Sequence, residues 1–86
     1  MEKKEFVLKE INQIFRNSLQ EPDLCLNYSS SANDVAKWDS INNLILLTEI
    51  EDCFGIAFPI DIILNAKNIG DLCDYVVEHS PKVDTI

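Results

Sequence analysis

The sequence has very few of the residues that build metal sites and covalent frameworks, namely one histidine and three cysteines in 86 residues. A structural zinc site needs four such ligands at workable spacings, and no Cys-x-x-Cys pair is present. Cys25, Cys53 and Cys73 are odd in number and widely spaced, so we do not expect a disulfide framework. We therefore expect no metal site, and free thiols in a reducing, cytoplasmic compartment.

Long apolar runs and basic residues are also scarce. The longest apolar run, Leu44 to Leu47, is far too short to span a membrane, and the N-terminus lacks the apolar stretch of a signal peptide. Seven basic residues stand against fifteen acidic ones, which gives a net charge of −8. This imbalance argues against nucleic acid and anionic membranes as partners and favours proteins with basic surfaces.

Glycine and proline are rare as well, with two and three copies, so the chain is not of low complexity. Its length and ordinary composition, 47% hydrophobic and 26% charged, predict one small folded domain. Such a domain has little room for a deep enzyme cleft. A lone histidine near the C-terminus and a serine without flanking glycines also argue against a small hydrolase.

Apolar residues at intervals of three and four predict a first helix over about 3–19, with Asn12 among the polar residues expected on its outer side. The core stripe of this helix consists of Val7, Ile11, Ile14, Phe15 and Leu19. A long, turn-rich connection, 20–39, follows. We expect four spaced apolar residues to pin it over the core: Leu24, Leu26, Val35 and Trp38.

The next helix is predicted over 40–54, with Asp39 as its N-cap and Gly55 as its stop. A helical wheel places Leu46, Ile50 and Phe54 together as the core stripe. A second apolar face lies opposite, which predicts a partner surface unless the loop and a short helix cover it. The residues of this predicted surface are Ile41, Leu44, Ile45, Thr48, Glu51 and Asp52.

The rest of the chain predicts a short helix over 60–65 and a last helix that begins after Asn68 and ends near His79. The expected fold is therefore all-α, a small bundle of three main helices plus one short helix, with a long loop between the first and second helices. We expect residues 1–80 to form one monomeric domain and residues 81–86 to form a flexible tail.

Ser40 is the candidate functional residue. Its hydroxyl is expected at the positive end of the second helix, where a phosphate is favourable. Serine is also common at helix starts for capping alone, so the position by itself does not decide between a modified and an unmodified residue.

The sequence around Ser40 resembles that of acyl carrier proteins over nearly the whole chain. The resemblance rests on an Asp-Ser-Ile triplet, a Phe-Gly connector at the expected distance and a closing helix: Trp38-Asp39-Ser40-Ile41, Phe54-Gly55-Ile56-Ala57-Phe58-Pro59 and Ile69 to Val76. It implies that a separate, magnesium-using phosphopantetheinyl transferase attaches 4′-phosphopantetheine from coenzyme A to Ser40, with Asp39 flanking the site.

The same resemblance implies a carrier with no catalysis of its own and no catalytic residues. It would present acyl or aminoacyl thioesters to acyl-loading and acyl-transferring enzymes of fatty-acid or specialised-metabolite biosynthesis. Asn42 and Asn43 stand where many fatty-acid carriers have an acidic residue. The alternative is an unmodified acidic helical adaptor that binds a protein through the helix that starts at Ser40.

Overall fold

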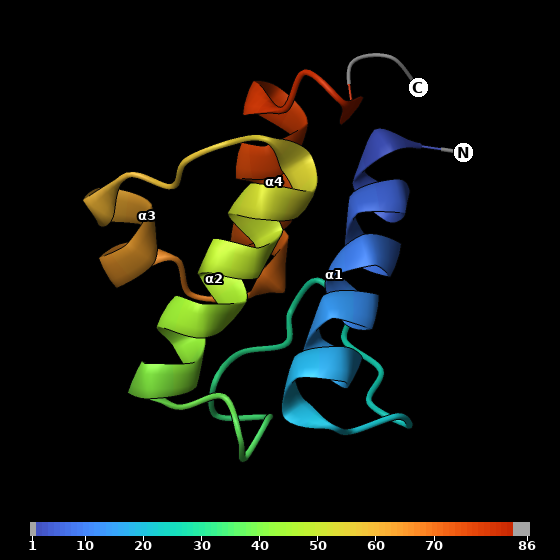
Figure 1. The fold of residues 1–86 in the computed structure, drawn as a ribbon, viewed down its shortest axis with the longest axis vertical. Coiled ribbons are helices and arrows are strands. Elements are labelled where there is room, and N and C mark those ends of the chain that lie inside the picture. The colour runs from blue at the N-terminus through green and yellow to red at the C-terminus, as the bar shows by residue number, and fades with distance from the viewer. Residues whose placement is uncertain (1, 84–86) are drawn as a thin grey trace.

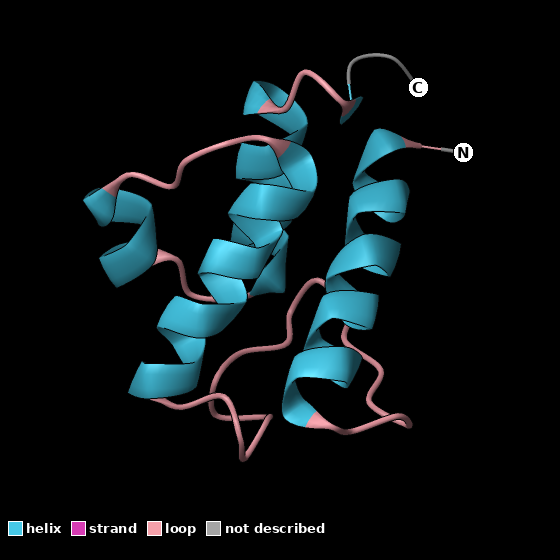
Figure 2. Cartoon of the chain, viewed as in Figure 1, coloured by secondary structure: helices cyan, strands magenta, loops and turns pink. Residues whose placement is uncertain are grey.

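The computed structural model describes residues 2–83, and within them the regular secondary structure is all helix (Figures 1 and 2). Four helices follow one another: α1 (Lys3–Leu19), α2 (Ser40–Phe54), α3 (Ile60–Asn65) and α4 (Ile69–His79). The predicted all-α bundle, with one short helix and a long loop after α1, is confirmed. None of the described helices is long and apolar enough to cross a membrane.

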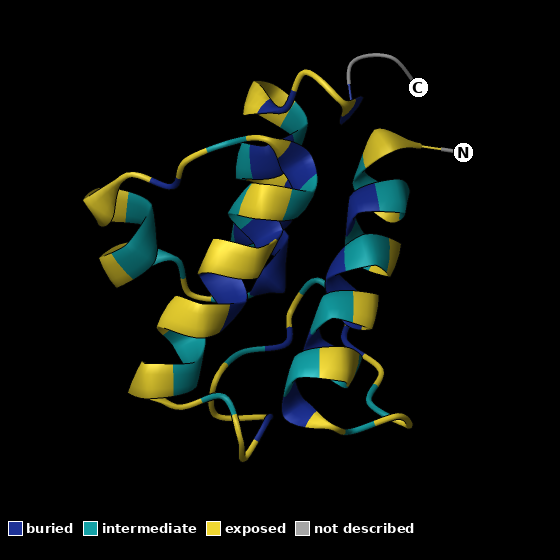
Figure 3. Cartoon of the chain, in the orientation of Figure 1, coloured by how far each residue is buried: buried dark blue, intermediate teal, exposed yellow. Residues whose placement is uncertain are grey.

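Helix α1 packs against both α2 and α4, while the short α3 lies to one side (Figure 1). The buried faces of α1, α2 and α4, dark blue in Figure 3, meet in one core. The predicted α2 stripe is confirmed, because Leu46, Ile50 and Phe54 are almost completely buried. Most of the predicted α1 stripe is buried as well, with Ile14 only half-buried.

The prediction that Asn12 faces outward is wrong. Its side chain is buried, and both ends of its amide are hydrogen-bonded to the loop. Oδ1 accepts from the Leu26 amide at 2.6 Å, and Nδ2 donates to the Leu26 and Leu8 carbonyls at 3.2 and 3.0 Å. A buried amide is tolerated because these bonds satisfy it. Asn12 thus ties the loop to α1.

The loop is also bonded to the start of α4. The amides of Ile69 and Gly70 donate to the carbonyls of Ser30 and Tyr28, each at 2.8 Å. A Cβ atom at position 70 would lie 2.9 Å from the Tyr28 carbonyl oxygen, so glycine is required for this close approach. Leu26 and Val35 are buried, which confirms that the loop is pinned over the core.

The C-terminal end of α2 is closed by the segment after α4. Gly55 adopts a left-handed conformation with φ of 68°, as its position predicts. Ser80 Oγ donates to the Phe54 carbonyl at 2.8 Å, and Lys82 Nζ donates to the Cys53 carbonyl at 3.0 Å. Val83 is fully buried. Residues 84–86 of the expected tail lie outside the described residues.

The burial pattern gives a test of which α2 face supports the fold. Phe54→Ala should lower the free energy of unfolding by about 3–5 kcal/mol, because it empties a fully packed site. Ser40→Ala, at an exposed position, should change it by less than about 0.5 kcal/mol. Urea unfolding followed by circular dichroism measures both. Equal losses in the two variants would contradict the assignment of faces.

Candidate functional site

The first turn of α2 presents Ser40 to solvent at a well-capped helix start. Asp39 Oδ1 accepts a hydrogen bond from the Asn42 amide at 2.8 Å, which confirms Asp39 as the N-cap. Ser40 is the first helical residue, and its side chain is exposed. Its hydroxyl bonds to no residue that the structure describes. The site therefore offers an unengaged hydroxyl at the positive end of a helix.

The two asparagines after Ser40 hold the end of the loop against α2. Asn42 Nδ2 donates to the Lys37 carbonyl at 2.7 Å, while Asn43 Oδ1 accepts from Trp38 Nε1 at 2.8 Å. The Trp38 ring stands edge-on to Phe15, with centroids 5.1 Å apart and planes at 86°. This confirms Trp38 as a packing anchor, and it gives both asparagines a structural reason that the sequence did not reveal.

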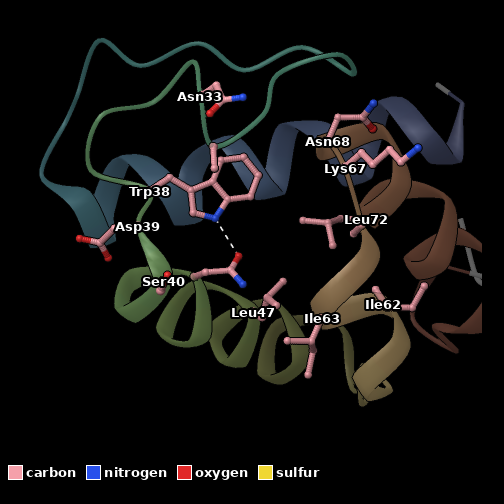
Figure 4. Close-up of a pocket in the computed structure, with 13 residues that line it drawn as sticks. Asn33, Trp38, Asp39, Ser40, Leu47, Ile62, Ile63, Lys67, Asn68 and Leu72 are labelled. Atoms are coloured by element: carbon pink, nitrogen blue, oxygen red, sulfur yellow. Dashed lines mark hydrogen bonds between the residues drawn. The ribbon is translucent and has the colours of Figure 1, made fainter.

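An open groove of about 430 Å³ lies beside Ser40 (Figure 4). The loop, α2, α3 and the start of α4 all contribute to its walls. Lining residues include Asp39 and Ser40 at one end, Trp38 from the loop, and a set of apolar side chains: Leu47, Ile62, Ile63, Ala66 and Leu72. No deep cleft was expected, and this groove is indeed a surface feature. One sequence feature could have indicated this groove, namely the adjacent pair Ile62 and Ile63 in a helix of only six residues.

The second apolar face of α2 is in solvent. Ile41, Leu44 and Ile45 are 74%, 57% and 49% exposed, so neither the loop nor α3 covers them (Figure 3). Thr48 and Asp52 are exposed beside them. We call Ile41, Leu44, Ile45, Thr48 and Asp52 the α2 outer face. That it binds partners stays a prediction.

Glu51 has a structural partner instead of standing free on this face. It is half-buried, and its carboxylate accepts a hydrogen bond from the Phe58 amide at 2.6 Å. The bond fixes the connector between α2 and α3. Sequence reasoning missed two further exposed apolar residues on α3: Ile60 and Leu64, 71% and 75% exposed.

The three cysteines and the histidine are not placed to take part in a reaction at Ser40. Cys25 is exposed, Cys53 half-buried and Cys73 buried. Burial raises the pKa of the Cys73 thiol to about 12, so this thiol stays protonated and inert. His79 stacks on Tyr75, with ring centroids 4.1 Å apart, at the end of α4. The start of α2 is at the opposite end of the bundle (Figure 1). A Ser40–histidine nucleophile pair is therefore not formed.

The buried thiol predicts a pH dependence of stability. An unfolded thiol loses its proton above about pH 8.5, whereas folded Cys73 keeps it up to about pH 12. The unfolded state then binds fewer protons, so stability falls as pH rises between these values, by up to about 1.4 kcal/mol per pH unit. Urea unfolding at several alkaline pH values should show a shallower fall in Cys73→Ala. Identical pH slopes in the two proteins would contradict the assignment.

Comparison with known protein families gives one positive finding. The profile of a family described as "Phosphopantetheine attachment site" matches residues 11–76, which is well over half of the chain. The matched segment runs from α1 into α4 and contains Ser40 and all the groove-lining residues named above. Searches of curated proteins and of solved structures gave no significant match.

Proposed function

The chain belongs to the phosphopantetheine-binding family, whose members carry 4′-phosphopantetheine covalently, and we propose that Ser40 is the residue that carries it here. The observation that supports this assignment most strongly is the position of Ser40. Its exposed, unengaged hydroxyl stands at the capped start of α2, at one end of the groove. A transferase can reach this hydroxyl without disturbing the core.

The residues around Ser40 fit a phosphate ester. Asp39 and Asn42 fix the first turn, so the backbone amides at the start of the helix keep their orientation. The first turn of α2 contains no acidic side chain after Ser40, so no carboxylate of that turn repels an attached phosphate. The groove gives the rest of a long, flexible group a surface to lie on.

An attached phosphopantetheine supplies a thiol on a flexible arm, which can hold acyl groups as thioesters. The protein's own residues position this arm and carry out no bond-making. Members of this family are generally carriers without catalysis, and such a carrier interacts with a phosphopantetheinyl transferase and with biosynthetic enzymes. The function we propose is therefore that of an acyl or aminoacyl carrier of fatty-acid or specialised-metabolite biosynthesis.

The α2 outer face is the surface that we assign to these enzymes. It has an apolar centre, Ile41, Leu44 and Ile45, and the acidic residues Glu49 and Asp52 stand on the same helix. A partner with an apolar patch and a basic rim matches this pattern and the net charge of −8. Because the first turn after Ser40 has Asn42 and Asn43 and no acidic residue, we favour partners of a specialised pathway.

Mass spectrometry tests the attachment site. Incubation with coenzyme A, magnesium and a broad-specificity transferase should add one phosphopantetheine to the chain, and Ser40→Ala should gain none. Circular dichroism should show that this variant is folded. Modification that persists in Ser40→Ala would disprove the site. A folded native chain that gains no mass would instead support the alternative function, an unmodified acidic adaptor.

The assignment of the α2 outer face predicts an effect on the rate of loading. Leu44→Asp should slow formation of the modified protein by about tenfold or more, because it places a charge at the apolar centre of the contact. Leu64→Asp, the same change at an exposed position of α3, is the matched control. Initial rates are measured by mass spectrometry, with circular dichroism as the folding check. A folded Leu44→Asp protein that loads at the native rate would rule out the role of Leu44.

A further inference from the structure

The segment that leads into helix α2 is hydrogen-bonded to the first turn of the helix. The amides of Asn42 and Asn43 donate to Oδ1 and to the carbonyl oxygen of Asp39, each at 2.8 Å. Two further bonds come from the asparagine side chains. Asn42 Nδ2 donates to the Lys37 carbonyl at 2.7 Å. Asn43 Oδ1 accepts from Trp38 Nε1 at 2.8 Å, the bond dashed in Figure 4. We call these two side-chain bonds the asparagine clamp.

The two residues held by the asparagine clamp are also fixed to α1. Lys37 Nζ donates to the Leu19 carbonyl at 3.1 Å and pairs with the Glu21 carboxylate at 2.9 Å. The Trp38 ring packs edge-on with Phe15, with centroids 5.1 Å apart. The clamp therefore joins the end of α1 to the start of α2, and the backbone that enters α2 is held from both helices.

The position of the Ser40 hydroxyl depends on this backbone. The side chain is exposed and bonds to no residue that the structure describes, so no side-chain contact holds its oxygen in place. The bond from Asn42 to the Lys37 carbonyl is exposed to water, which competes for both groups, so it should add little to the stability of the whole fold. Its effect should instead be on the local geometry around Ser40.

We propose that Asn42 and Asn43 are positioning residues for the attachment reaction, because the asparagine clamp holds the Ser40 hydroxyl in one orientation toward the transferase. The inference rests on the proposed function, since it concerns the attachment step. In that step Ser40 Oγ bonds to the phosphorus that bears pantetheine, the pyrophosphate P–O bond of coenzyme A breaks, and adenosine 3′,5′-bisphosphate leaves. The hydroxyl proton passes to a base of the transferase. The alignment of the attacking oxygen with the leaving group governs the rate of such a displacement.

Two aspartate substitutions separate the asparagine clamp from the charge of the first turn. Asn42→Asp adds a negative charge and removes the N–H donor to the Lys37 carbonyl. Asn43→Asp adds the same charge one residue later but keeps an oxygen that accepts from Trp38 Nε1, so it is the matched control. If a basic transferase recognised this turn by charge, both variants would load faster than the native chain. If the clamp positions Ser40, Asn42→Asp loads more slowly than its control.

The rate of mass gain is measured with coenzyme A, magnesium and a broad-specificity transferase, at varied concentrations of the chain. Asn42→Asp should have a kcat about fivefold or more below that of Asn43→Asp, with KM values within about twofold, because the α2 outer face is unchanged. Asn43→Leu removes the acceptor of the Trp38 N–H without adding charge, and it should lower kcat in the same way. Partial unfolding would give a different result, since it reduces the concentration of folded substrate and raises the apparent KM while kcat stays the same.

The outcomes separate the two proposals. A native chain that gains no mass overturns the proposed function, and this inference with it. Equal kcat values in Asn42→Asp and Asn43→Asp, faster loading of Asn42→Asp than of the native chain, or a loss confined to KM would each overturn this inference alone. Circular dichroism checks that each variant is folded. If Asn43→Leu does not fold, Trp38→Phe takes its place, because phenylalanine keeps a ring against Phe15 and lacks the N–H donor.

Discussion

Helix α2 has to bury one apolar face while the opposite apolar face stays in water, and the rest of the structure depends on how this is achieved. Leu46, Ile50 and Phe54 pack into the core, whereas Ile41, Leu44 and Ile45 are exposed. Exposed apolar side chains favour any arrangement that would bury them, so the helix must be held in one orientation. The buried core stripe provides this, and Ser80 and Lys82, from the segment after α4, bind carbonyls in the last turn of the helix.

The long loop becomes part of the site because a few polar groups pair with backbone. Asn12 binds the loop at Leu26, the first amides of α4 bind it at Tyr28 and Ser30, and Asn43 binds Trp38. Each bond satisfies a group that would otherwise be costly to bury, so together they fix the loop instead of leaving it mobile. The groove beside Ser40 exists because the loop is fixed in this way.

Helix α3 is the least firmly packed element of the described structure. None of its residues is fully buried, and Ile62 and Ile63, which are half-buried, also line the groove. An element with few buried contacts moves at low free-energy cost. A group that enters the groove would add apolar contacts to Ile62 and Ile63. The weak packing of α3 would therefore let this wall adapt to a group that entered the groove.

The sequence by itself determined the helices, their caps, the core stripe of α2 and the candidate Ser40, because each depends on residues close together along the chain. Periodicity, an Asp before a helix and a Gly after it act locally. The tertiary structure alone decided the burial of Asn12, the roles of Asn42 and Asn43, the engagement of Glu51 with the connector and the groove itself. These depend on partners that the fold brings together, such as Leu26 with Asn12 or Phe58 with Glu51, and no local pattern records which distant backbone or side chain a polar group will meet.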